Sequence, residues 1–150
     1  MITEMNPIKI SISRDVVTGI IKRSTLFVEQ ICVCLKEYNL TIQQFNVLRI
    51  LKGRKGRPAC LQDVNRDMIH SKSNTTRVID KLIQKNLVER VQSTDDRRQI
   101  QLTITKKGCE LLELINPRVD EVEQELTRNL TEYEMATIVQ LLNKLEIKTD

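Results

Sequence analysis

The sequence predicts a mainly α-helical protein with one small two-stranded β-wing. Apolar residues recur every three or four positions over most of the chain, which is the spacing of one face of an α-helix. Two neighbouring segments, LVERVQS and RQIQLTIT, alternate apolar and polar residues, and the polar TDDR stands between them. Such alternation is typical of half-buried strands. The expected order of elements is therefore α-α-α-α-β-β-α-α.

The composition fits one compact domain. The chain has 150 residues, of which 40% are hydrophobic and 29% charged, and the expected domain spans residues 1–150. No run of about 18 apolar residues is present, and the first residues lack the basic-then-apolar order of a signal peptide, so we expect a cytoplasmic protein. Aromatic residues make up only 3%, which disfavours stacking on unpaired RNA bases. The net charge of +4 is too small to identify a partner by itself.

Four helices are expected in the first half of the chain. The first is long, from about 13 to 38, and the second begins at Thr41, which forms a capping-box pattern with Gln44. The segment GRKGRPAC, with two glycines and a proline, interrupts the helical pattern. A short helix follows over 61–68, and another is expected over about 71–85, with the serine at its start as the N-cap.

Two further helices are expected after the hairpin. Thr105 caps a long helix in which Pro117 either introduces a kink or starts a fresh segment. Thr131 and Glu134 form a second capping box, which opens a final helix reaching about Leu145. The first helix and the last two carry more apolar surface than a domain of this size needs locally, so we expect them to pack against a second copy. The predicted division is into dimerisation helices at 13–38 and 106–147 and a lobe at 41–105.

The two short helices, the tight turn between them and the hairpin follow the order of a winged helix-turn-helix, whose second helix enters the major groove of DNA. At about 100° per residue, one side of that helix is apolar and another is polar and basic. The apolar side carries Val78, Ile79, Leu82 and Ile83. The residues expected to contact DNA are Ser71, Lys72, Ser73, Asn74, Thr76, Arg77 and Lys81.

These polar residue types have the chemistry of DNA contacts. Arg77 can donate two hydrogen bonds to guanine, Asn74 can bond to adenine, and serine or threonine hydroxyls can contact bases or phosphates. Lys72 and Lys81 are better suited to phosphates than to bases. Because many basic helix faces are simply solvated, the interpretation depends on the neighbouring hairpin.

The tip of the hairpin carries Arg97 and Arg98 next to two aspartates. A guanidinium at the end of a narrow wing can enter the minor groove, whose negative potential attracts arginine. Asp96 is expected to pair with Arg98 and to fix its direction. The alternative is a solvated, charged turn.

Residues 71–108, SKSNTTRVIDKLIQKNLVERVQSTDDRRQIQLTITKKG, resemble the recognition helix and wing of the MarR family of transcriptional regulators. The resemblance includes an Asp-x-Arg wing motif at Asp96 and Arg98, which a strand and a helix start follow at a fixed distance. The segment LTIQQFNVLRIL at 40–51 is similar to the family's second helix. The resemblance covers nearly the whole chain.

Two residues depart from the family pattern. Asn65 stands where a small alanine is usual, which can alter the packing between the two short helices. Asn86 replaces the usual glycine, but asparagine also fits the left-handed position that often ends a helix.

The resemblance implies a homodimeric repressor that reads a near-palindromic operator in double-stranded DNA and responds to a ligand. It implies no cofactor. Effectors of such proteins are small phenolic or other lipophilic molecules, held between the dimer helices and the winged lobe. The sequence itself does not identify the residues of that pocket.

The remaining chemically distinctive residues predict no catalytic or metal site. Cys32 and Cys34 lie about 200° apart around a helix, so they are expected to be packing residues. Cys60, near a loop, is the candidate for the oxidant sensing that some MarR-like proteins carry out. A turn or capping role fits His70 better than metal ligation. No nucleophile paired with a base, phosphate-binding glycine loop or metal-spaced cluster is present, so we expect no enzyme activity.

Two other functions stay open from the residues alone. A winged helix can bind proteins, with its basic helix merely solvated, and the same fold can serve a small ligand-binding protein or an enzyme. Arg77, Lys81 and Arg98 lie on the two elements that would face DNA, and they favour DNA binding over both alternatives.

Overall fold

The computed structural model of the chain describes residues 7–69, 74–93 and 100–145. Within these ranges the elements follow the predicted order of four helices, two strands and two helices. They are α1 (Pro7–Lys36), α2 (Ile42–Gly53), α3 (Leu61–Asp67), α4 (Thr75–Gln84), β1 (Val88–Gln92), β2 (Ile100–Ile104), α5 (Lys106–Thr127) and α6 (Glu132–Leu142). The predicted fold class, mainly helical with a two-stranded antiparallel wing, is confirmed.

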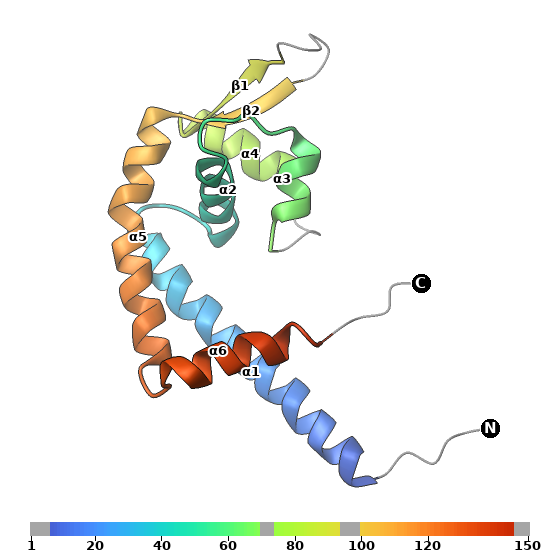
Figure 1. Ribbon diagram of the computed structural model, residues 1–150. Helices are drawn as coiled ribbons and strands as arrows, with labels where there is room; N and C mark the ends of the chain where they lie inside the picture. Colours follow the sequence, from blue (N-terminus) through green and yellow to red (C-terminus); the bar gives the residue numbers. More distant parts are fainter. Residues whose placement is uncertain (1–6, 70–73, 94–99, 146–150) are drawn as a thin grey trace, which may run out of the picture.

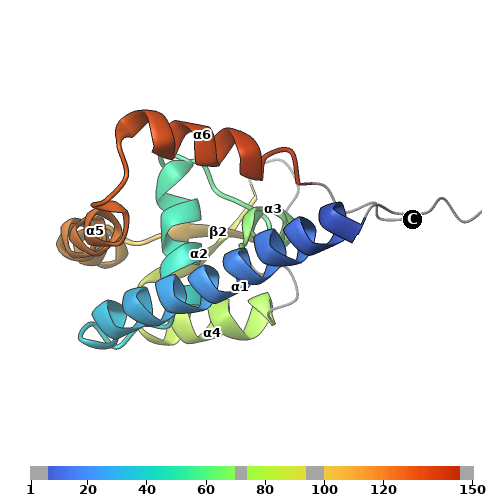
Figure 2. The same cartoon turned by 90° about the horizontal axis from the view of Figure 1, so that it is seen from below.

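The elements divide between a lobe and a set of long helices that leave it. In Figure 1, α2, α3, α4 and the hairpin form the upper part of the molecule, and α5 descends along one side. Helix α6 crosses in front of α1 in this view, but Figure 2 shows that the two helices lie apart. The far ends of α1 and α6 are therefore not packed against each other within one chain.

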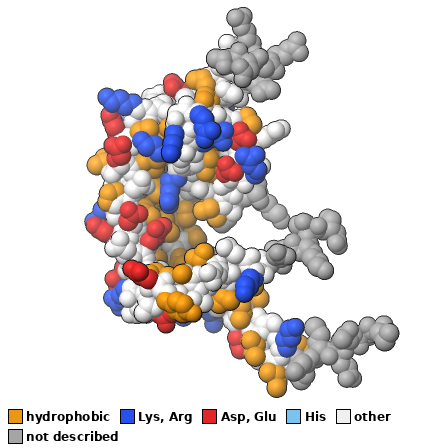
Figure 3. All heavy atoms as spheres, viewed as in Figure 1, with side chains coloured by type: hydrophobic (Ala, Val, Ile, Leu, Met, Phe, Trp, Pro, Cys, Tyr) orange, Lys and Arg blue, Asp and Glu red, His pale blue; other side chains and the backbone are white. Residues whose placement is uncertain are grey.

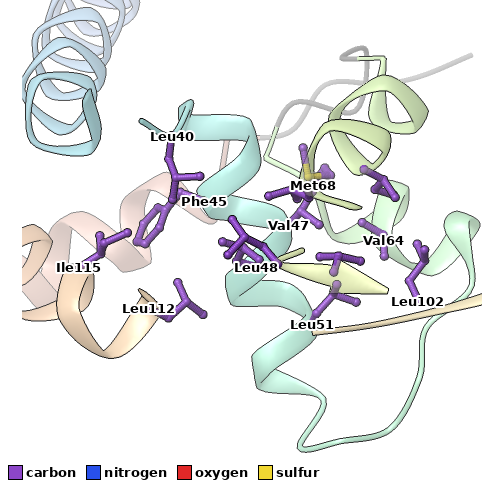
Figure 4. Packing of buried hydrophobic residues seen from close by; sticks show 14 of the residues in the cluster. Leu40, Phe45, Val47, Leu48, Leu51, Val64, Met68, Leu102, Leu112 and Ile115 are labelled. Atoms are coloured by element: carbon purple, nitrogen blue, oxygen red, sulfur yellow. The ribbon is translucent and has the colours of Figure 1, made fainter. Parts of the chain in front are cut away.

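The hydrophobic core lies around α2. Leu48, at the middle of this helix, is fully buried, and Phe45 points toward Leu112 and Ile115 of α5 (Figure 4). These contacts attach the lobe to the long helices. Replacing such a buried leucine with alanine typically costs about 2 to 5 kcal/mol. The buried cluster consists of Leu35, Leu40, Phe45, Val47, Leu48, Leu51, Ala59, Val64, Met68, Ile79, Leu82, Leu87, Val88, Leu102, Leu112, Ile115 and Val119.

The helix caps predicted at Thr41, Thr105 and Thr131 are confirmed. Thr41 Oγ1 accepts a hydrogen bond from the Gln44 amide at 3.2 Å, and Gln44 Oε1 accepts one from the Thr41 amide at 3.1 Å. The same reciprocal box joins Thr131 and Glu134 at the start of α6. Asn86 has the predicted left-handed backbone, with φ of 58°. These bonds satisfy amide groups that would otherwise lack partners at helix starts.

Two helices do not begin at the serines predicted to start them. Helix α1 begins at Pro7 rather than near Ser13, whose hydroxyl instead donates to the Lys9 carbonyl one turn earlier at 2.8 Å. A serine within a helix can make this backward bond, so its N-cap preference misplaced the boundary. The helix expected to start at Ser71 begins at Thr75, because Asn74 is the N-cap.

Three helices end earlier than predicted. Helix α1 ends at Lys36 rather than at 38, α3 ends at Asp67 rather than at 68, and α6 ends at Leu142 rather than near 145. Pro117 lies within the single helix α5 and does not start a fresh segment. Helix ends fray, so apolar spacing alone locates them to within one or two residues.

Candidate nucleic-acid interface

Helix α4 has the two faces that the sequence predicts. Ile79 and Leu82 are buried in the core, and Val78 and Ile83 pack against it half-buried. Four of the residues predicted to contact DNA lie on the described part of the helix or at its start, and all four are exposed: Asn74, Thr76, Arg77 and Lys81. The buried face fixes the helix, so its polar face is presented outward.

The amide side chain of Asn74 already has one partner. Its Oδ1 accepts a hydrogen bond from the Arg77 backbone amide at 3.1 Å and caps α4. A bidentate contact to adenine would require both Oδ1 and Nδ2. The capping geometry therefore leaves the nitrogen of Asn74 as its available donor, and Arg77 as the described side chain best suited to reading a base.

Asn65 has a specific role in joining the two short helices. Its Oδ1 accepts a hydrogen bond from the hydroxyl of Thr75 at 2.8 Å, and Thr75 is buried at the first position of α4. A buried hydroxyl without such a partner would carry a desolvation cost. The departure from the usual alanine thus connects α3 to the start of the exposed helix.

Backbone hydrogen bonds and an ion pair connect the wing strands to the rest of the lobe. Ala59, just before α3, exchanges backbone hydrogen bonds with Leu102 of β2, with N···O distances of 2.9 and 2.7 Å. Arg90 of β1 forms an ion pair with Asp80 of α4. This pair links the wing directly to the helix beside it. Sequence reasoning missed it, although Asp80 and Arg90 are oppositely charged residues on two elements expected to be neighbours.

Hydrogen bonds of Lys85 join the C-terminal end of α4 to neighbouring parts of the fold. Its Nζ donates to the Asn39 carbonyl oxygen at 2.5 Å and to Gln44 Oε1 at 3.3 Å. Lys107 of α5 donates to the Lys85 carbonyl oxygen at 3.0 Å. These hydrogen bonds join the C-terminal end of α4 to the turn after α1, to α2 and to the start of α5.

The rest of the predicted DNA-contacting set lies outside the described residues. This holds for Ser71, Lys72 and Ser73 before α4 and for Asp96, Arg97 and Arg98 at the wing tip. The wing motif consequently stays a prediction from the sequence. His70, for which a turn or capping role was expected, also lies outside the described ranges.

Cys60 takes part in the cap of α3. Its Sγ accepts a hydrogen bond from the Asp63 amide at 3.4 Å, and the Asp63 carboxylate accepts one from the Cys60 amide at 3.3 Å. The Cys60 side chain, then its amide, and then nearby Arg54 and Arg66 hold the pKa of Asp63 below its ordinary value. The proposed sensing role of Cys60 stays a prediction.

The other cysteines are free thiols in the structure. Burial is the main reason why the pKa of Cys34 is raised, with a smaller opposing effect of Arg118. Cys32 is exposed on α1. Among the described residues, no group of three or more histidine, cysteine or acidic side chains is arranged to hold a metal ion. In the same ranges, no helix has the length and hydropathy needed to cross a bilayer.

A short helix followed by an exposed basic helix and a pair of antiparallel strands is the arrangement of a winged helix-turn-helix protein. Comparisons with known proteins agree. Residues 30–115 match the family model of the transcriptional regulator SarA/Rot. The chain is 32% identical over 117 residues to the HTH-type transcriptional regulator BilQ of Clostridioides difficile, covering 77% of this chain and 78% of that protein. It is also 32% identical over 114 residues to the multiple antibiotic resistance protein MarR of Escherichia coli, covering 74% and 76% of the two chains.

Solved structures show the same relationship. A mutant of E. coli MarR complexed with operator DNA superposes with a TM-score of 0.75 at 26% identity, covering 85% of this chain and 90% of that one. Bordetella bronchiseptica BpsR, whose DNA binding is regulated by 6-hydroxynicotinic acid, gives 0.75 at 25% identity, with 87% and 97% covered. The chain therefore belongs to the MarR family of winged helix-turn-helix transcriptional regulators. The relatives named here are transcriptional regulators rather than enzymes.

Proposed function

We propose that the protein is a homodimeric repressor that binds a specific operator through α4 and the wing. The observation that carries this proposal is the exposed face of α4, where Arg77 and Lys81 stand outward from a buried apolar side. Arginine reads guanine through two hydrogen bonds, and lysine neutralises phosphates. The DNA-bound structure of E. coli MarR supports the same use of this fold.

Uncovered apolar surface on the long helices supports the dimer. Helix α6 has no buried residue, although Tyr133, Val139 and Leu142 are large and apolar. Much of α1 is likewise exposed, including Ile12 and Ile21. Figure 3 shows hydrophobic side chains along α6 and the lower part of α1. Apolar patches of this extent usually mark a protein interface, and a second copy would bury them.

Dimerisation places two recognition helices on one DNA molecule. In a two-fold dimer they enter successive major grooves about 34 Å apart, which requires a near-palindromic site. The Arg98 side chains at the two wing tips would reach the flanking minor grooves. If each half neutralises about four phosphates, the logarithm of the binding constant falls against the logarithm of salt concentration with a slope of about −7.

Ligand control follows from the connection between the long helices and α4. A ligand that favours a different separation of the two recognition helices lowers DNA affinity. The regulation of BpsR by 6-hydroxynicotinic acid supports a small organic effector. The bond from Lys107 of α5 to the Lys85 carbonyl, and those from Lys85 to Asn39 after α1 and to Gln44 of α2, support such control.

The proposal is tested by titrating the full-length protein against the DNA upstream of its own gene at low salt. Arg77→Ala should weaken binding by about 1 to 3 kcal/mol, or about 5-fold to 150-fold, because one base contact is removed. Arg98→Ala tests the wing in the same assay. Arg128→Ala is the matched control, because Arg128 lies in the turn between α5 and α6 and pairs with Glu125.

Each result has a separate meaning. No binding by the wild type would contradict the proposed function. Wild-type binding that survives Arg77→Ala unchanged would contradict the assignment of α4 as the recognition helix. An unaffected Arg98→Ala variant would remove the wing contact from the proposal and leave α4 in place.

A further inference from the structure

A hydrogen bond between α3 and the first turn of α4 lies next to the proposed base contacts. Asn65 Oδ1 accepts it from the Thr75 hydroxyl at 2.8 Å. We propose that Asn65 is a positioning residue for base recognition, which acts through Thr75 to hold the start of α4 in the orientation that directs Arg77 toward a base. This role rests on the proposed function, and Asn65 stands outside the set of residues that we assign to DNA contacts.

Thr75 is the polar member of the buried face of α4. The buried residues of this helix are Thr75, Ile79 and Leu82, whose spacing places them on one side. Thr75 is only 5% exposed. A buried hydroxyl is costly unless it has a hydrogen-bond partner, and Asn65 supplies one from the neighbouring helix. The contact between α3 and the start of α4 is therefore directional.

A directional contact restricts a helix more than apolar packing does. The hydrophobic effect depends on the area that is buried and has no preferred direction. A hydrogen bond instead weakens steeply when its distance or angle departs from the favourable range. Buried polar pairs that are satisfied make the surrounding structure more rigid and favour one arrangement. The bond between Asn65 and Thr75 thus limits rotation of the first turn of α4 relative to α3.

This restraint acts at the end of α4 that we expect to read DNA. The N-terminal residues of a recognition helix contact base edges. Arg77 follows Thr75 by two positions and lies about 200° around the helix axis from it, so holding Thr75 in the lobe keeps Arg77 outward. Arg77 is exposed, and its backbone amide is held by Asn74 Oδ1 at 3.1 Å. A side chain that reads a base must be held within about 0.5 Å of its working position.

A direct contact between Asn65 and a DNA phosphate is the competing role, because Asn65 is exposed on α3. Phosphate contacts carry no sequence information, so losing one weakens binding to every duplex by a similar factor. Losing a positioning residue instead weakens binding to the specific site more than to unrelated DNA. The ratio of the two affinities distinguishes the roles.

The first experiment measures this ratio with the full-length protein at one salt concentration. The specific duplex comes from the DNA upstream of the gene, and the second duplex has the same length and a scrambled sequence. Asn65→Ala and Thr75→Val should each lower the ratio at least about fivefold, the lower end of what one bidentate base contact contributes. Thr75→Ser keeps the hydroxyl and should retain the ratio.

Asn65→Asp is the conservative variant, because a carboxylate still accepts a hydrogen bond from the Thr75 hydroxyl. Its negative charge should weaken binding to both duplexes and leave their ratio near the wild-type value. Gln62→Ala is the matched control, since Gln62 is another exposed amide on α3, about one turn before Asn65. This change should also retain the ratio.

The second experiment asks whether Asn65 acts through Arg77. In an Arg77→Ala background, adding Asn65→Ala should lower the ratio no further, because the side chain that Asn65 positions is already absent. Equal losses with and without Arg77 would show that Asn65 affects recognition independently and would overturn the proposal. Circular dichroism and thermal unfolding verify that each variant is folded at the assay temperature.

The outcomes separate this role from the proposed function. If Asn65→Ala leaves the ratio unchanged, the positioning role is wrong, whether binding to both duplexes falls together or not at all. If Asn65→Asp loses the ratio as Asn65→Ala does, the bond to Thr75 is not what matters. A wild type that binds the two duplexes equally would contradict the proposed function, whereas a wild-type preference that survives Asn65→Ala would contradict only the role of Asn65.

Discussion

Gly108 lies where α5 begins beneath the first wing strand, and no side chain fits there. A Cβ at this position would stand 2.4 Å from the Leu87 carbonyl oxygen and 2.7 Å from Ile104 Cγ1. The Gly108 amide also donates to Thr105 Oγ1 at 3.0 Å, which caps α5. The missing side chain therefore allows the strand and the helix start to approach closely.

Gly108→Ala should destabilise the protein by about 2 kcal/mol, because backbone and a packed isoleucine must both move. Urea unfolding measures the effect. Gly53→Ala is the matched control, since Gly53 also lies in a helix and a Cβ there meets nothing within 4 Å, so little change in stability is expected. Equal stability of the two variants would contradict the close approach.

Several residue-level predictions from the sequence were correct where the chemistry is local, although the helix starts predicted at Ser13 and Ser71 were not. The left-handed backbone of Asn86 and the caps at Thr41 and Thr131 depend on bonds within a few residues, so the local sequence is sufficient. The hydrogen bond between Asn65 and Thr75 could not be predicted from the sequence, because Thr75 lies ten positions away on another helix. Long-range pairs of this kind depend on how elements pack.

At the scale of single elements, the start of α6 depends on an ionised carboxylate. Hydrogen bonds from the Thr131 amide first, and then from its hydroxyl, hold the pKa of Glu134 below its ordinary value of 4.5. The carboxylate form is the one that accepts both bonds. The contribution of the box to stability is therefore complete above pH 4.5 and is lost as the pH falls through the folded-state pKa.

Carbon-13 NMR of the Glu134 carboxyl should show titration below pH 4.5 in the wild type. Thr131→Val removes the hydroxyl donor and keeps the backbone amide, so the pKa should rise only part of the way back. An unshifted titration in the wild type would show that the reciprocal box is not formed in solution.

We expect the ion pair between Asp80 of α4 and Arg90 of β1 to orient the wing. Both side chains are about half exposed, so Asp80→Asn should change the free energy of unfolding by less than about 1 kcal/mol. Operator affinity should nevertheless fall severalfold, because the wing is no longer held against α4. Parallel urea unfolding and DNA titration measure the two effects.

The double variant Asp80→Arg, Arg90→Asp reverses the pair and should restore part of the lost DNA affinity. A single Arg90→Asp change supplies the baseline for this comparison. If the double variant binds no better than the single variants, the pair does not position the wing.

Element types were predictable because hydrophobic periodicity depends on which face is buried. The division of α4 into an apolar and a basic side was read correctly for that reason. The start of α1 was not, because the segment before Ser13 alternates apolar and polar residues and contributes nothing to the core of one chain.

At the scale of the whole molecule, we expect the exposed apolar side chains of α6 to form part of the proposed dimer interface. Val139→Asp should convert the expected dimer into monomers, because a charge would be buried at the interface. Ile100→Asp is the matched control, since Ile100 is 60% exposed on the wing strand and Val139 is 59% exposed. Analytical ultracentrifugation distinguishes the two. A dimeric Val139→Asp variant would place the interface elsewhere.

Selection of binding sites from random double-stranded DNA tests the central claim most directly. The full-length wild-type protein should enrich inverted repeats whose half-site centres lie about one helical turn, or about 10 base pairs, apart. Arg77→Ala should relax the base preference at one position of each half-site and keep the spacing. Recovery of no preferred sequence, or of single half-sites without a repeat, would contradict a dimeric regulator that reads DNA through α4.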